Sequence, residues 1–330
     1  MKFRTLSAND VLNALPMSDA IEGMKTAFAQ LSTGKARVPL RTHEHLGEST
    51  GNSLLFMPAL LKETNALAVK VGSIFPDNPN QGEPVIYASV LVLDPRTGRP
   101  LAMMEGSTIT AIRTGAGSGA ATDLLAREDA SVAAILGSGV QARTQLEAVC
   151  TVRNIREVRV YSRTEDGARE FAREMGGKGP IPRQINVMTN AEQAVRGAHV
   201  ICAATSSFQP VLKYPWLTPG THINGVGSYL PGMQEIDEET VKKALVVVDS
   251  REAALAEAGD LIIPLRSKTI YEDHIHAELG EIVSGLKQGR DNPRQITFFK
   301  SVGVAVQDVI AAQIALQNAE SQGLGTIVDM

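Results

Sequence analysis

The residues best suited to chemistry form a glycine turn at Gly137, Gly139 and Ala142, in the spacing G-x-G-x-x-A. The turn follows an apolar, strand-like run and precedes a helix-forming segment, which is the context that a dinucleotide-binding turn requires. Gly137 permits the tight turn, Gly139 lets a pyrophosphate approach the backbone, and Ala142 lets the helix pack on its strand. The free N–H groups at the start of the helix, beside Val140 and Gln141, then receive the phosphate charge. The spacing predicts a dinucleotide site; a glycine turn in an ordinary α/β protein is the alternative.

The next predicted strand, 157–161, ends in Ser162, Arg163 and Thr164. In NAD-binding proteins an acidic residue about 20 positions after the turn binds the ribose 2′-hydroxyl. Here a hydroxyl and a guanidinium stand in that place, and Arg offers a fixed fork of donors to an oxyanion. The pattern favours NADP(H) over NAD(H), with use of both cofactors and a solvated Arg163 as the alternative.

Three cations in the first third of the chain have unusual surroundings. Lys70 lies inside an apolar strand-like run, Arg113 lies among small residues, and Arg41 follows Val38-Pro-Leu. A lysine in an apolar strand is costly unless it is paired or lies at an edge. Converging cations would bind a carboxylate substrate. Taken one at a time, each is more readily explained as a surface or salt-bridge residue.

Lys70 is also the candidate catalytic residue. A desolvated lysine between other cations releases its proton more easily, which allows general acid catalysis near neutral pH. The hydroxyls of Tyr87 and Tyr229 are rival proton donors.

The histidines are weaker candidates. His274 and His276 lie near carboxylates, but the segment is interpreted as a polar loop, and we predict no metal site. His43 and His45 flank the Arg41 segment and are interpreted as solvated strand residues.

The composition is that of an ordinary globular protein, with 43% hydrophobic and 21% charged residues among 330. A net charge of −4 gives no general attraction to nucleic acid or to an anionic membrane. We therefore expect no nucleic-acid or membrane partner. The N-terminal residues lack the apolar core of a signal peptide, which favours a cytoplasmic enzyme. Cys150 and Cys202 stand in apolar segments and are expected to be reduced and buried.

The predicted elements fall into two regions. Before residue 108, helical patterns precede strand-like runs joined by short turns, which indicates an α+β region with an antiparallel sheet. A long helix, 108–125, leads out of this region. From Ser131 onward strands and helices alternate, and the apolar strands indicate a parallel sheet covered on both faces. The last helix, 303–317, is apolar on much of its surface and is expected to pack back on the first region.

The chain resembles the ornithine cyclodeaminase/mu-crystallin family over almost its whole length. The resemblance rests on seven ordered motifs: Val38–Arg41 with Leu55–Pro58, Val69–Pro76, Thr110–Thr114, Gly137–Ala142, Cys202–Ser206, Pro231–Asp237 and Ser301–Asp308. It implies an α/β protein in which a Rossmann NAD(P)-binding domain, 119–302, is inserted in an α+β substrate-binding and dimerisation domain, 1–118 plus 303–330. It also implies a homodimer.

The resemblance further implies roles for residues of this chain. Arg41, Lys70 and Arg113 would bind the carboxylate of an amino acid or imino acid. Ser228 and Val302 would also line the substrate site. The residues implied to line the cofactor are Arg113, Thr114, the glycine turn, Thr205, Val226, Gly227, Ser228 and Ser301.

One departure from the family pattern bears on the reaction. Cyclodeaminases of the family carry an Asp in Gly-Ala-Asp-x-Pro-Gly-Lys, whereas this chain has no Asp before Pro231 and has Met233 in place of the Lys. We therefore expect an NADP(H)-dependent reductase of a cyclic ketimine, such as pyrroline-2-carboxylate or piperideine-2-carboxylate. The alternatives are an alanine dehydrogenase-type enzyme, an ornithine cyclodeaminase, and a non-catalytic NADPH-binding protein of the mu-crystallin kind.

Overall fold

The computed structural model describes residues 2–39, 42–47 and 51–329, and its contacts divide the chain into two compact units. Unit 1 comprises Met1–Arg113 and Ala305–Met330, and unit 2 comprises Thr114–Val304. The helix α3 (Gly106–Leu125) contains the boundary between them. The division into units does not test the predicted roles of the two domains in substrate and cofactor binding, which stay a prediction.

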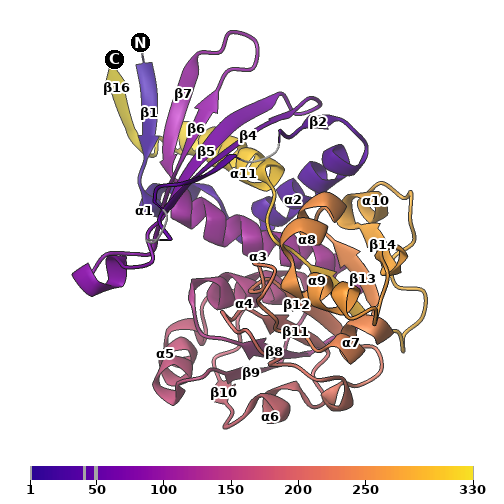
Figure 1. Cartoon of the computed structure of the whole chain (residues 1–330). Coiled ribbons are helices and arrows are strands. Elements are labelled where there is room, and N and C mark those ends of the chain that lie inside the picture. The colour runs from indigo at the N-terminus through magenta and orange to yellow at the C-terminus, as the bar shows by residue number, and fades with distance from the viewer. Residues whose placement is uncertain (1, 40–41, 48–50, 330) are drawn as a thin grey trace. The chain divides into compact units, whose positions relative to one another are not determined.

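Unit 1 contains an eight-stranded sheet in the order β16-β1-β7-β6-β5-β4-β2, with β3 paired to β4 (Figure 1). Its strands are β1 (Lys2–Leu6), β2 (Ala36–Arg37), β3 (Thr42–His45), β4 (Ser53–Leu61), β5 (Ala66–Ile74), β6 (Ile86–Leu93), β7 (Pro100–Glu105) and β16 (Thr326–Asp329). The pairs are antiparallel, as predicted, except that β1 runs parallel to β7. Strands from the two ends of the chain therefore share one edge of this sheet.

The helices of unit 1 pack on one face of its sheet. They are α1 (Ala8–Ala14), α2 (Met17–Ser32), the start of α3, and α11 (Ala305–Gln322). A short 3-10 turn, η1 (Asn78–Gln81), lies between β5 and β6 along the chain. Ser7 and Asp10 form a reciprocal capping box that starts α1. Met24 and Phe28 of α2 are fully buried, and each contributes about 1.5–3 kcal/mol of apolar burial. The helix α11 contacts α2, β4 and β5, so the C-terminal helix completes the core of the first region.

Unit 2 contains an entirely parallel sheet in the order β10-β9-β8-β11-β12-β15-β13-β14. Its strands are β8 (Val132–Leu136), β9 (Glu157–Tyr161), β10 (Ile185–Val187), β11 (Val200–Ala203), β12 (His222–Gly225), β13 (Leu245–Val248), β14 (Ile275–Glu278) and β15 (Thr297–Lys300). The first five strands along the chain stand in the spatial order 3-2-1-4-5 of the dinucleotide-binding fold. The order reverses between β8 and β11, and a ligand binds such a sheet at the carboxyl ends of the strands at this point.

Helices cover both faces of this parallel sheet. They are α4 (Val140–Val152), α5 (Glu165–Met175), α6 (Ala191–Val195), α7 (Glu238–Lys243), α8 (Arg251–Glu257), α9 (Gly259–Arg266) and α10 (Leu279–Val283), with 3-10 turns η2 (Tyr214–Trp216) and η3 (Glu272–His274). One core packs α4 and α5 through Leu146 and Phe171, and the other packs α7 and α9 through Val241 and Leu261. Every residue of β11, β12 and β15 is buried, as expected for strands covered on both faces.

The predicted α/β class with a Rossmann-type region is confirmed, but short strands were missed. The sequence interpretation omitted β1, β2, β10, β14, β15 and β16, which have two to five residues each. The interpretation of His274–His276 as a loop was wrong, because η3 and β14 occupy this segment. Within the described ranges, the helices are too short or too polar to cross a lipid bilayer.

Candidate functional site

The glycine turn has the geometry that a bound pyrophosphate needs. Gly137 adopts a φ of +109°, and a side chain there would lie 2.4 Å from the carbonyl oxygen of Ala204. Gly139 is the N-cap of α4, and open space lies where its side chain would point. Ala142 is fully buried, whereas Val140 in the first turn of α4 is 65% exposed. These residues fit a dinucleotide, because an accessible helix N-terminus adjoins backbone that no side chain covers.

The end of β9 meets the glycine turn through a hydroxyl pair. Ser162 Oγ lies 2.9 Å from Ser138 Oγ, which fixes the two segments side by side. Arg163 is exposed, and Thr164 caps α5 without a side-chain hydrogen bond to the backbone. No acidic residue ends β9, which is compatible with the predicted 2′-phosphate contact of Arg163.

Small residues of α3 allow α4 to approach closely within unit 2. A side chain at Gly115 would lie 2.5 Å from the carbonyl oxygen of Thr144. Gln145 Nε2 donates a hydrogen bond to the carbonyl oxygen of Thr114 at 3.2 Å. The predicted cofactor residue Thr114 is thereby fixed against the helix that the glycine turn begins.

Two of the three predicted cations converge in unit 1, and a carboxylate lies between them. Lys70 Nζ lies 3.1 Å and Arg113 Nε lies 3.2 Å from the same atom, Asp308 Oδ1. Arg113 Nη1 also donates to Gln307 Oε1 at 3.0 Å. Lys70 and Arg113 are only 8% and 6% exposed. Because β5 is a central strand, the burial of Lys70 requires an anionic partner, and α11 supplies it.

Lys70 and Arg113 are therefore salt-bridge residues in this structure, which was the alternative given for each of them. That they bind the carboxylate of a substrate stays a prediction. Arg41 lies outside the described residues. Sequence reasoning missed Asp308, although it stands in the quoted motif 301–308. A buried lysine in an apolar strand calls for a carboxylate elsewhere, and an Asp inside the apolar final helix was the available signal.

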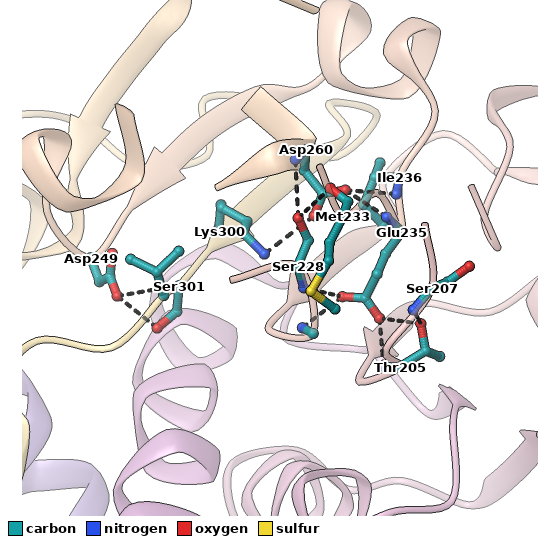
Figure 2. A network of polar contacts seen from close by, with 12 residues as sticks. Thr205, Ser207, Ser228, Met233, Glu235, Ile236, Asp249, Asp260, Lys300 and Ser301 are labelled. Carbon is teal, nitrogen blue, oxygen red and sulfur yellow. Dashed lines mark hydrogen bonds and ion pairs between the residues drawn. The ribbon is translucent and has the colours of Figure 1, made fainter. Parts of the chain in front are cut away.

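The loops after β11 and β12 meet at a second missed carboxylate, Glu235, as Figure 2 shows. Glu235 Oε1 accepts hydrogen bonds from the backbone N–H of Thr205 at 2.6 Å and from its hydroxyl at 2.8 Å. Glu235 Oε2 accepts from the N–H groups of Gly227 at 2.6 Å and Ser228 at 3.2 Å. The predicted cofactor residues Thr205, Gly227 and Ser228 therefore share one fully buried acceptor.

An ion pair between Asp260 and Lys300 lies beside Glu235. Asp260 Oδ1 accepts from the backbone N–H groups of Glu235 at 2.7 Å and Ile236 at 3.0 Å, and Asp260 Oδ2 lies 3.2 Å from Lys300 Nζ. Burial and the nearby Asp260 raise the pKa of Glu235 to about 7, against the opposing effects of Lys300 and the Thr205 donors. Ser228 Oγ donates to Met233 O and accepts from Asp260 N, and the side chain is fully buried. These bonds occupy both the hydroxyl and the N–H of Ser228 within the protein.

A third carboxylate, Asp249, shapes the segment that follows β15. Its Oδ2 atom accepts from Ser301 Oγ, Val302 N and Gly303 N at 2.8–2.9 Å. The predicted site residues Ser301 and Val302 are thus held in a turn at the carboxyl end of β15. The loops after β8, β9, β11, β12 and β15 all lie at the same edge of the parallel sheet. Val226, buried at the end of β12, donates its N–H to Ala203 O at 3.0 Å.

The other histidine and tyrosine candidates bond to backbone or to surface groups, or are exposed on a loop. His274 Nε2 and His276 Nε2 each lie 2.8 Å from a backbone carbonyl oxygen. No group of three or more possible metal ligands occurs in the part of the chain that the structure describes. Tyr87 binds Glu83 through its hydroxyl, and this hydrogen bond raises the pKa of Tyr87. Tyr229 is 47% exposed on the loop after β12.

Comparison with known proteins identifies the family. The sequence pattern of the ornithine cyclodeaminase/mu-crystallin family matches residues 2–323. The chain belongs to this family.

A Δ1-pyrroline-2-carboxylate reductase of Bacillus cereus is 40% identical, over 98% of this chain and 99% of its own length. The Δ1-pyrroline-2-carboxylate reductase of Thermococcus litoralis, solved in complex with NADH and L-proline, is 48% identical. That alignment covers 98% of this chain and 100% of the solved one, with a TM-score of 0.93. An archaeal alanine dehydrogenase dimer with bound NAD is 36% identical, covers 100% of both chains and has a TM-score of 0.91. These three relatives are two reductases and one dehydrogenase, and each alignment covers at least 98% of this chain.

Proposed function

We propose that the protein is an NAD(P)H-dependent oxidoreductase that reduces Δ1-pyrroline-2-carboxylate, or a closely related cyclic ketimine, to an L-amino acid. The observation that carries this proposal is the similarity, at 40% and 48% identity, to two Δ1-pyrroline-2-carboxylate reductases over nearly the full chain. The buried cation pair of unit 1 and the open glycine turn of unit 2 supply the groups that such a reaction needs.

Each unit contributes a distinct part of the reaction. In unit 1, Lys70 and Arg113 hold the substrate carboxylate, together with Arg41, because opposite charges at hydrogen-bond distance orient a small acid. When bound, the nicotinamide cofactor supplies the hydride that reduces the C=N bond. Lys70 or water gives the proton that the imine nitrogen takes up. The chain thus supplies orientation and charge, and Lys70 is its candidate proton donor.

The remaining site assignments form part of the same proposal. The carboxyl edge of the parallel sheet holds the cofactor, and Ser228 and Val302 face the substrate. The proposed cofactor residues are Arg113, Thr114, Gly137, Gly139, Val140, Gln141, Ala142, Ser162, Arg163, Thr164, Thr205, Val226, Gly227, Ser228 and Ser301. Preference for NADP(H) rests on Ser162 and the exposed Arg163, because a guanidinium pairs with a 2′-phosphate. A cytoplasmic location stays a prediction from the sequence.

We propose that the protein is a homodimer formed through the outer face of the unit 1 sheet. In the described part of unit 1, large apolar side chains on this face remain partly exposed. They include Phe56, Leu67, Val69, Val71, Leu91 and Met103. Contiguous exposed apolar surface of this kind marks an interface. Residues 1–118 and 303–330 would then serve substrate binding and dimerisation, and residues 119–302 would bind the cofactor. Val69→Lys should convert the dimer to monomer in light scattering, whereas Lys62→Glu, at an exposed position in the turn that follows β4, should not.

A spectrophotometric screen tests the reaction. NADH and NADPH oxidation are followed with pyrroline-2-carboxylate, piperideine-2-carboxylate, and pyruvate plus ammonia, and the L-proline formed is quantified. We expect the fastest turnover with a cyclic ketimine. Pyruvate plus ammonia as the best substrate would favour the second candidate, an alanine dehydrogenase, to which the chain is 36% identical. Turnover of L-ornithine alone to proline and ammonia would overturn the reductase assignment.

A further inference from the structure

The loops that follow β11 and β12 are packed directly against each other in unit 2. A side chain at Gly227 would lie 2.0 Å from Thr205 O and 2.5 Å from Glu235 Oε1. Thr205 also accepts a hydrogen bond from Ser207 N at 3.3 Å, which tightens its own loop. Both loops stand at the carboxyl edge of the sheet, and the loop after β11 borders the point between β8 and β11 where the strand order reverses and where dinucleotides bind.

We propose that Glu235 is a positioning residue for the cofactor, whose carboxylate sets the shape of the loops at Thr205 and at Gly227–Ser228 that receive the dinucleotide. This inference rests on the proposed function, since it assumes that the carboxyl edge of unit 2 binds NAD(P)H. Glu235 is not proposed to contact the cofactor. It acts through the four hydrogen bonds that its carboxylate accepts from the two loops.

The donor set requires an ionised carboxylate. Three backbone N–H groups and one hydroxyl aim at two oxygens, and a carboxylate offers about four lone-pair sites with no hydrogen of its own. Glutamine has the same shape but places an NH₂ group on one side, where it faces either the Thr205 donors or the donors of the β12 loop. One of the two loops then loses its acceptor, and a buried N–H without a partner is costly. Aspartate keeps the charge but is shorter by one methylene group, so it reaches one loop better than the other.

The buried charges around Glu235 make this contact sensitive to pH. The charged groups that face it are Asp260 and Lys300, which form an ion pair at 3.2 Å. Two carboxylates and one ammonium leave an excess negative charge, and burial together with Asp260 raises the pKa of Glu235 to about 7. Protonation would place a hydrogen among four donors and release at least one of them. The loops are therefore expected to lose order, and the cofactor to bind more weakly, as pH falls through this value.

The test compares Glu235→Gln and Glu235→Asp with the matched control Glu239→Gln, which makes the same chemical change at an exposed position of α7. NADH and NADPH dissociation constants are measured by cofactor fluorescence without substrate, in steps from about pH 8 to about pH 6. Hydrogen exchange of the apoprotein is measured over residues 203–208 and 226–230. These readouts do not depend on turnover.

We expect Glu235→Gln to weaken binding of both cofactors by roughly 10- to 100-fold at the upper pH and to speed exchange in at least one loop. The wild-type dissociation constant should rise toward low pH, whereas that of Glu235→Gln should be nearly independent of pH. Glu235→Asp should lie between them and keep a pH dependence. If Glu235→Gln does not fold, the aspartate variant still tests whether a carboxylate must reach both loops, since weaker cofactor binding and faster exchange in one loop are expected for it as well.

The proposal is overturned if either Glu235 variant binds the cofactors and responds to pH as the wild type and Glu239→Gln do. Failure of the proposed function gives a different result. In that case the wild type binds NADH or NADPH in the same pH-dependent manner but reduces no imino acid. A wild type that binds neither cofactor contradicts both proposals.

Discussion

Removal of the carboxylate of Asp308 is the sharpest test of the buried cation pair. Asp308→Asn keeps the shape of the side chain but leaves Lys70 and Arg113, 8% and 6% exposed, without their shared anion at 3.1–3.2 Å. Loss of one partner from a buried ion pair typically costs about 3–5 kcal/mol, because the remaining charge stays desolvated. We expect the free energy of unfolding, measured by urea denaturation, to fall by about this amount.

A carboxylate ligand should recover part of this loss. L-Proline, the expected product, brings its own carboxylate to the two cations, and in the variant it no longer shares them with Asp308. Its affinity should rise by about 10- to 150-fold, since a hydrogen bond to a charged group is worth about 1.5–3 kcal/mol. Each tenfold gain in affinity adds about 1.4 kcal/mol of stabilisation at saturating ligand. Proline should therefore stabilise the variant more than it stabilises the wild type.

The control is Asp77→Asn, a change of the same kind at an exposed position of unit 1, which should alter neither stability nor the effect of proline. The reasoning is refuted if Asp308→Asn unfolds at the same urea concentration as the wild type. Equal stabilisation of both proteins by proline, with the stability loss present, would mean that Lys70 and Arg113 are structural and that the carboxylate binds elsewhere.

Three further outcomes are expected. Arg163→Ala should weaken NADPH binding by about 1.5–3 kcal/mol and leave NADH binding almost unchanged in fluorescence titration; equal losses would remove Arg163 from the 2′-phosphate site. Lys70→Arg keeps the positive charge but cannot release a proton, so it should preserve the KM for the imino acid better than it preserves kcat. Lys70→Ala should weaken substrate binding and also lower kcat. A kcat near that of the wild type in both variants would exclude Lys70 as the proton donor. His222 is fully buried, and its burial lowers its pKa from 6.5 to about 3. The unfolded chain therefore binds the extra proton below pH about 6.5, so this contribution to stability is complete above that pH and declines, by up to about 1.4 kcal/mol per pH unit, as pH falls toward 3. His222→Gln should flatten this part of the acid unfolding curve, and identical curves for variant and wild type would contradict the assignment.

The sequence was most informative where local rules dominate. The glycine turn could be predicted because a positive φ at Gly137 and uncovered backbone at Gly139 restrict those positions to residues without side chains. The long apolar strands β5 and β6 were recognised from their composition. The four-residue strand β15 was missed because a run of Thr, Phe, Phe and Lys is too short to show a period. Its place between β12 and β13 depends on pairing partners that lie far away in sequence.

The carboxylates that organise the site could not be assigned from local pattern. Three carboxylates, Asp249, Glu235 and Asp308, accept hydrogen bonds from distant residues, and the donor to Asp308 is 238 positions away. A carboxylate in sequence is usually a solvated surface group, and only the fold shows which ones are desolvated. Lys70 offered the one local clue, since its apolar strand required a distant anion.

The discontinuity of unit 1 has a consequence for how the chain folds during synthesis. The strand β1 pairs with β16, and the core of the first region needs α11, so its packing cannot finish until the ribosome has made residues 305–329. Until then Lys70 and Arg113 have no Asp308, and the apolar faces of β4 and β5 stay uncovered. Unit 2 is continuous and can fold as soon as β15 emerges and enters the middle of its sheet. We expect a chaperone to bind the N-terminal third of the nascent chain and to release it when α11 packs on the sheet.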